Sequence, residues 1–251
     1  MTRFSVLAAG ALATAALLCA GGVEAAGPSK AIAAAVDDSA RPQADKDRDA
    51  VRKPAESLEF AGIKPGDKVV EVMPGGGYFT RLLSVAVGPK GHVYAVSPPP
   101  MGERDFGKAA KALAEDSHYS NVTAVGSAFT SISLPGPVDV VWTSDNYHDF
   151  HNGPNADIAA FNKAMLGLLK PGGTYVIIDH AAAAGAGTTV TSSMHRIDPA
   201  AVKEEVTAAG FKFVKEGNFL HRTDDPRNVP IRDPSVRGKT DQLAMKFAKP
   251  K

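Results

Sequence analysis

Short apolar runs alternate along this chain with longer segments in which apolar residues recur at helical spacing. The runs, about five residues each and bounded by Gly, Pro, Asn or Asp, predict strands, and the longer segments predict amphipathic helices. This alternation is typical of a parallel sheet with helices on both faces. Predicted strands lie at 69–73, 92–96, 121–125, 138–142, 175–178, 211–214 and 241–247. Predicted helices lie at 54–60, 78–87, 106–115, 157–169 and 199–209.

One junction between a strand and a helix is filled by three glycines. Gly75, Gly76 and Gly77 follow Pro74, and helical spacing resumes at Tyr78. Glycine has no Cβ and tolerates positive φ, so a ligand can lie directly against this backbone. The unpaired N–H groups and the dipole at the start of the helix favour an anionic group. A tight turn without a ligand is the alternative interpretation, and the surrounding sequence has to decide between the two.

The composition is that of an ordinary globular protein. The 251 residues are 44% hydrophobic and 22% charged, which fits one well-filled domain. The 28 Lys and Arg residues nearly balance the 27 Asp and Glu residues, so no strong overall field is available to hold nucleic acid. We therefore expect no nucleic-acid partner, and the oligomeric state is left open.

The first 25 residues have the features of a secretory signal. Arg3 precedes an apolar run at 6–20, and Val23 and Ala25 are the small residues that a signal peptidase accepts. The run, about 15 residues, is short for a membrane-spanning helix. We expect export to the bacterial periplasm, with cleavage after Ala25 and no stable membrane span in the mature chain. We further expect a linker and helical cap at 26–62 and the main domain at 63–251.

The cysteine content agrees with an oxidising compartment. Cys19 is the only cysteine, and it lies within the predicted signal. The mature chain would then form no disulfide, and it would have neither a thiolate metal site nor a cysteine nucleophile.

Two common nucleotide-binding patterns fit the glycine turn poorly. A dinucleotide fingerprint requires a third small residue where Thr80 stands, and an acidic residue farther on where Ser97 precedes three prolines. A phosphate loop of the GxxxxGK type does not occur.

The chain resembles the class I S-adenosylmethionine-dependent methyltransferases, in particular an exported bacterial group of predicted methyltransferases. The segments that carry the resemblance are EVMPGGGYFT at 71–80, VDVVWTSDNYH at 138–148, LLKPGGTYVIIDH at 168–180 and RIDPAAVKEEVTAAGF at 196–211. The match extends from about residue 63 to the C-terminus. It implies a Rossmann-like doubly wound α/β sheet of seven strands, the last antiparallel, with helices on both faces.

The same resemblance implies S-adenosyl-L-methionine as cofactor, bound over the carboxyl ends of the first strands. Glu71 would hold the methionine amine, and the glycine turn would approach the cofactor. The cofactor-binding residues implied in this way are Glu71, Pro74, Gly75, Gly76, Gly77, Ser97, Ser127 and Asp145. The chain departs from the family where Met73 replaces a glycine and where Ser97 and Ser127 replace acidic residues. Loss of charge-assisted hydrogen bonds would weaken cofactor binding.

Three histidines follow predicted strands and would meet at one rim of the sheet. They are His148, His180 and His195, and imidazole is suited to remove a proton from a methyl acceptor. We predict His148 as the catalytic base, with His195 second. A metal site is the alternative, and its candidate ligands are Asp145, His148, Asp149, His151, Asp179 and His180. We predict no metal, and we expect Trp142 to lie in the core.

These features favour a methyltransferase that acts on a small-molecule acceptor. The alternative is an exported binding protein that retains the fold but does not catalyse a reaction. Two features support it: the serine replacements, and the signal peptide, because the cofactor is made in the cytoplasm. The basic loop at 223–238 is either a solvated surface or a lid over the site.

Overall fold

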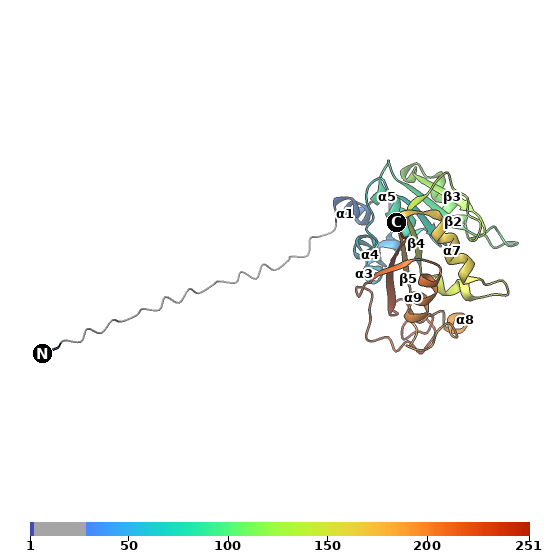
Figure 1. The fold of residues 1–251 in the computed structure, drawn as a ribbon. Helices are drawn as coiled ribbons and strands as arrows, with labels where there is room; N and C mark the ends of the chain where they lie inside the picture. The colour runs from blue at the N-terminus through green and yellow to red at the C-terminus, as the bar shows by residue number, and fades with distance from the viewer. Residues whose placement is uncertain (3–28) are drawn as a thin grey trace.

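The computed structural model describes residues 1–2 and 29–251, which form a sheet with helices around it (Figure 1). The seven strands of these residues lie in the order β3-β2-β1-β4-β5-β7-β6. The predicted signal at 3–25 lies outside the described residues. The strands are β1 Lys68–Val72, β2 His92–Ser97, β3 Val122–Gly126, β4 Val138–Ser144, β5 Leu169–His180, β6 Lys212–Glu216 and β7 Gln242–Ala248. Only β7 runs antiparallel to its neighbours, β5 and β6, within the described residues. The prediction of a seven-stranded sheet whose last strand is antiparallel is confirmed.

Both faces of the sheet are covered because neighbouring strand residues point to opposite sides. Val69 joins one core cluster with Leu82 of a helix that follows β1, while Val70 joins a second cluster with Phe161. The first face carries α1 Lys30–Asp37, α4 Pro54–Ala61, α5 Tyr78–Val87 and α6 Lys108–Glu115. The second face carries α7 Ile158–Leu168 and α9 Pro199–Ala208. Trp142 is fully buried, as predicted.

Short helices connect these layers. They are α2 Gln43–Lys46, α3 Asp49–Arg52, α8 Thr191–Met194 and the 3-10 helices η1 Ser117–Tyr119 and η2 Tyr147–His151. The sequence predicted only one or two helices before the sheet, whereas the structure has α1 to α4 there. Polar four-residue helices such as α2 and α3 carry no apolar stripe, so periodicity cannot detect them.

The predicted turn at 171–173 is instead part of β5. Gly173 accepts a hydrogen bond from Lys249, and Gly172 donates one to Lys249, so this segment pairs with the end of the chain. The pairing with β4 is irregular between Val138 and Val140. Pro and Gly in this position mark a bulge inside a strand, which a sequence pattern does not separate from a turn.

A buried ion pair anchors the long loop between β6 and β7. Arg196 donates two hydrogen bonds to Asp225, of 2.8 and 3.1 Å, and both side chains are wholly buried. Arg196 also donates to the carbonyl groups of Ala181 and Val229. Among the described residues, no helix has the length and apolarity needed to cross a bilayer.

Candidate active site

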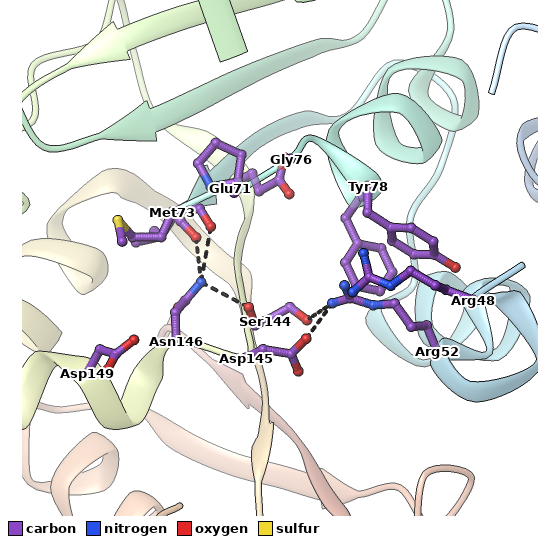
Figure 2. A pocket seen from close by; sticks show the side chains of 14 residues that line it. Arg48, Arg52, Glu71, Met73, Gly76, Tyr78, Ser144, Asp145, Asn146 and Asp149 are labelled. Carbon is purple, nitrogen blue, oxygen red and sulfur yellow. Dashed lines mark hydrogen bonds and ion pairs between the residues drawn. The ribbon is translucent and has the colours of Figure 1, made fainter. Parts of the chain in front are cut away.

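The carboxyl ends of β1 and β4 are held together by one amide side chain. Asn146 Nδ2 donates to the carbonyl oxygens of Val72 at 3.0 Å, Met73 at 3.3 Å and Ser144 at 3.0 Å (Figure 2). Met73 has a φ of 54°, the left-handed conformation that glycine adopts most easily. The residue that departs from the family glycine therefore keeps a glycine-like backbone.

A cavity of about 290 Å³ opens beside this junction. Among the cofactor-binding residues expected from the sequence, Glu71, Pro74, Gly75, Gly76 and Asp145 line it. The other three, Gly77, Ser97 and Ser127, do not. Further lining residues are Arg48, Arg52, Val72, Met73, Tyr78, Phe79, Ser144, Asn146 and Asp149.

The three glycines differ in what surrounds them. A Cβ added to Gly75 or Gly76 would meet no atom within 4 Å, so both leave open space along the cavity. A Cβ on Gly77 would lie 2.4 Å from Leu113 of α6. The φ of Gly77 is 80°, so a side chain there would strain the turn and would also press on the end of the Leu113 side chain.

Glu71 places a buried carboxyl group at the cavity. Its Oε2 accepts a hydrogen bond of 2.6 Å from Thr80 Oγ1. Burial raises the pKa of Glu71 to about 7, although the Thr80 hydrogen bond and the charges of Arg52 and Arg81 lower it. The group therefore changes charge near neutral pH.

Two arginines from the N-terminal helices form one side of the cavity. Arg52 donates to Asp145 Oδ2 at 2.7 Å and to Ser144 Oγ at 2.9 Å, and its guanidinium lies 4.5 Å from the ring centre of Tyr78. Arg48 lies 5.4 Å from the same ring, exposed, and forms no ion pair with residues 29–251. Figure 2 shows both beside Tyr78, well apart from Asp149.

Arg48, Arg52 and Asn146 were not predicted from the sequence as residues of the site. The four-residue spacing of the two arginines predicts that they share a helix face. That spacing does not indicate that the two arginines reach the end of β4. There Arg52 contacts Asp145, which lies about 90 positions farther along the chain. Asn146 stands in the segment that carried the resemblance, but only the structure reveals the carbonyl groups that it binds.

The two serines lie away from the first cavity, where Ser97 ends β2 and Ser127 follows β3. Ser97 is buried and donates a hydrogen bond to the carbonyl of Phe106, while the Ser127 hydroxyl donates to the neighbouring Ala128 carbonyl. A second cavity beside Ser97 measures about 40 Å³, enough for a few water molecules. A nucleoside placed there would have to displace the loop at 98–107.

Three side chains meet beside the first cavity and form what we call the imidazole cluster: His148, Asp149 and His195, of which Asp149 lines that cavity. His148 Nε2 lies 3.2 Å from His195 Nδ1 and 3.3 Å from Asp149 Oδ1, and the last two atoms are 3.5 Å apart. Beneath them, His148 Nδ1 lies 2.8 Å from Asp179 Oδ1. Helix η2 supplies His148 and Asp149, and the residue after α8 supplies His195.

The members of the imidazole cluster differ in exposure and charge. The side chain of His148 is 2% exposed, that of His195 32% and that of Asp149 44%. Burial alone would lower the pKa of His148, but the charges and hydrogen bonds of Asp179 and Asp149 raise it to about 10. His148 is therefore the buried, positively charged member, and the other two are accessible.

The remaining ligand candidates of the metal alternative point elsewhere. His151 pairs with Glu205 at 3.0 Å, and His180 Nδ1 lies 2.7 Å from Thr240 Oγ1. Asp145 is engaged by Arg52. The six residues considered together from the sequence do not form one site.

The architecture is similar to that of solved methyltransferases. A SAM-dependent methyltransferase from Aquifex aeolicus superposes with a TM-score of 0.60 at 20% identity, over 83% of this chain and 98% of that one. The chain has the class I methyltransferase fold. A glycopeptide N-methyltransferase solved with S-adenosyl-L-methionine shares this class I methyltransferase fold, with a TM-score of 0.53 at 16% identity over 78% of this chain and 86% of that one.

Sequence comparison adds one distant relative of known activity. The protein-L-isoaspartate O-methyltransferase of Ignicoccus hospitalis is 32% identical over 121 residues, which cover 48% of this chain. The chain spans half the length of that relative. No family model matches the sequence. Neither comparison shows that the chain belongs to an exported group of methyltransferases.

Proposed function

We propose that this protein transfers a methyl group from S-adenosyl-L-methionine to a small-molecule acceptor. The observation that carries the proposal is the cavity at the ends of β1 and β4. It combines open glycine backbone, a buried carboxyl group and an arginine without an ionic partner among the described residues. In open α/β sheets, ligands bind at this kind of crevice. The methyltransferase fold supports the same conclusion, although a fold alone does not determine a reaction.

The cavity residues fit the amino-acid part of the cofactor. Glu71, when ionised, suits the ammonium group, and Arg48 suits the carboxylate. Gly75 and Gly76 allow the rest of the molecule to lie against the backbone. The cofactor supplies an electrophilic methyl group. The residues of the protein bind the cofactor, orient its methyl group toward the acceptor and exclude water.

A neighbouring cavity of about 310 Å³ suits the acceptor. Phe129, Phe150 and Phe161 line it, and Asp149 lines both this cavity and the first one. An acceptor whose apolar body contacts these rings would present its nucleophilic atom at the imidazole cluster. We therefore propose a small acceptor with an apolar or aromatic part.

Within the imidazole cluster, we assign contact with the acceptor to His195 ahead of His148. His195 is accessible, whereas His148 is buried and already holds a proton at neutral pH because its pKa is raised to about 10. His148 is then a positioning residue, which orients His195 through the 3.2 Å contact between His148 Nε2 and His195 Nδ1. This order reverses the one expected from the sequence.

Calorimetry with S-adenosyl-L-methionine and S-adenosylhomocysteine on the full chain tests the binding step. Transfer of labelled methyl groups to a panel of phenols, amines and thiols then tests the reaction. We expect both cofactor forms to bind and one acceptor class to be methylated. Absence of binding at millimolar cofactor would overturn the proposal, and binding without transfer to any acceptor would favour the non-catalytic alternative.

We also propose that the protein is exported to the periplasm. The support is the sequence alone: the apolar run at 6–20, the small residues before position 26 and the lack of cysteine after Cys19. Fractionation of a bacterial host that expresses the chain, with sequencing of the mature N-terminus, should find cleavage after Ala25. An intact N-terminus in the cytoplasmic fraction would contradict export.

A further inference from the structure

We propose that the imidazole cluster of His148, Asp149 and His195 binds a divalent transition-metal ion, for which Zn²⁺ is the best match. One ligand atom from each residue lies within 4.8 Å of the other two. The inference depends on these residues and their neighbours, and it holds whether or not the protein transfers methyl groups.

The spacing of the three atoms is that of a coordination shell. The distances between them are 3.2, 3.3 and 3.5 Å. Ligands about 2.1 Å from a tetrahedral metal ion are separated by about 3.4 Å, and those of an octahedral ion by about 3.0 Å. An ion can therefore be placed between the three atoms with small side-chain adjustments.

A buried carboxylate fixes the orientation of the deepest ligand. Asp179 Oδ1 accepts from His148 Nδ1 and, at 2.8 Å, from the backbone N–H of His180, while Oδ2 accepts from the backbone N–H of His148 at 2.7 Å. This arrangement keeps one proton on Nδ1 and directs Nε2 at the cluster. In the metal-free protein Nε2 also carries a proton at neutral pH, so binding of the ion would release that proton to water. Histidine ligands of metal ions commonly donate their other ring N–H to a carboxylate in this way.

His195 is held toward the cluster by its backbone. It follows α8 with a φ of 54°, a left-handed conformation that is costly for a residue with a Cβ. This conformation brings Nδ1 of His195 to within 3.2 Å of Nε2 of His148, from a residue 47 positions away.

The ligand types select the class of ion. Two imidazole nitrogens and one carboxylate oxygen suit Zn²⁺ and neighbouring divalent transition metals, whereas Mg²⁺ and Ca²⁺ prefer shells of oxygen. Three protein ligands leave coordination positions open. Because Asp149 lines both cavities, an open position could receive a heteroatom of a molecule bound in either one. A bound cation lowers the pKa of such a group, so its proton is released to water.

Co²⁺ titration of the full chain, after removal of metals with a chelator, tests the site. Co²⁺ bound by nitrogen and oxygen ligands gives visible ligand-field absorption, which one equivalent of Zn²⁺ should abolish. We expect one bound ion per chain and no displacement by Mg²⁺. Zn²⁺ should also raise the melting temperature of the unsubstituted chain, because it binds only the folded state.

Two substitutions and a matched control locate the ion. His195→Ala and Asp149→Ala change accessible side chains, and each should weaken Co²⁺ binding by more than about tenfold. His118→Ala is the control, because His118 forms a surface imidazole–carboxylate pair with Asp38 at 3.1 Å outside the cluster. Failure of the unsubstituted chain to bind Co²⁺, or equal binding by all three variants, would overturn the proposal. Hydrogen bonds alone would then account for the short distances.

Discussion

Thr80, in the first turn of α5, donates a hydrogen bond of 2.6 Å to the carboxyl group of Glu71 at the end of β1. Both side chains are buried. The bond joins the strand and the helix on either side of the glycine turn. It also lowers the pKa of Glu71, which burial raises to about 7. Among the described residues that line the cavity, no other ionisable side chain is both buried and raised in pKa to near neutrality.

The raised pKa of Glu71 predicts a pH-dependent stability. Between its ordinary pKa of 4.5 and about 7, the folded protein holds a proton that the unfolded chain releases. The associated stabilisation is fully present below about pH 4.5 and is lost as the pH rises through 7. Urea unfolding from pH 4.5 to 8 should show a decrease in the free energy of unfolding, to which Glu71 contributes on the order of 3 kcal/mol. His148, whose pKa is raised from 6.5 to about 10, adds to the decrease above about pH 6.5. Glu71→Gln, which resembles the protonated form, should remove the contribution of Glu71 and leave that of His148. An unchanged pH slope in this variant would contradict the assignment.

Gly76→Val should block cofactor binding without unfolding the protein. Gly76 lines the cavity, a Cβ there meets no atom within 4 Å, and its φ is not positive. The new side chain can therefore fit the backbone while it occupies space needed by the ligand. We expect at least a tenfold loss of affinity, or about 1.4 kcal/mol, by calorimetry. Gly136→Val, which is equally unobstructed but outside the cavity, is the control. Unchanged affinity in a folded Gly76→Val protein would exclude the site.

Arg48→Ala should weaken the binding of both cofactor forms, since each carries the same carboxylate. Arg48 is exposed, so its removal should leave the melting temperature nearly unchanged. The loss should be smaller at high salt, because salt screens the attraction between exposed charges. Lys108→Ala removes one positive charge from α6, away from the cavity, and should have no such effect. Equal cofactor affinities for the two variants would show that Arg48 does not bind the cofactor carboxylate.

Arg196→Met should destabilise the fold by about 3–5 kcal/mol. The substitution leaves the buried carboxylate of Asp225 without its cation and leaves the carbonyl groups of Ala181 and Val229 without this donor. The double variant Arg196→Met, Asp225→Leu removes the uncompensated charge and should recover part of the loss. Urea unfolding measures both. A single variant as stable as the unsubstituted chain would show that the pair is not a structural anchor.

The sequence predicted those parts of the fold in which apolar periodicity is strong. Helix α5 begins at Tyr78 and ends at Val87 as predicted, because its apolar face packs on the sheet and glycines flank it. The N-terminal helices were underestimated because α2 and α3 contain no buried residue. Their conformation depends on ion pairs such as Arg41 with Asp49, which local patterns do not reveal.

The candidate site was only partly predictable for a related reason. The resemblance identified segments but not the direction of each side chain, so it grouped Gly77 with the two glycines that face the cavity. The relation of His148 to Asp179 and His195 depends on contacts between residues 31 and 47 positions apart. Such contacts follow from the strand order and from a strained residue after α8, neither of which is encoded in a short stretch of sequence.

The anchoring of Arg196 to Asp225 also restricts how far the long C-terminal segment can move. Arg196 donates three hydrogen bonds to Asp225 and Val229 of the segment between β6 and β7, and a fourth to Ala181 after β5, so it fastens the segment to the body of the sheet. A large swing of this segment would separate Asp225 from Arg196 and leave a buried charge without its partner, which costs about 3–5 kcal/mol. An outward opening of the C-terminal segment is therefore expensive in free energy, although the segment has no regular secondary structure for most of its length.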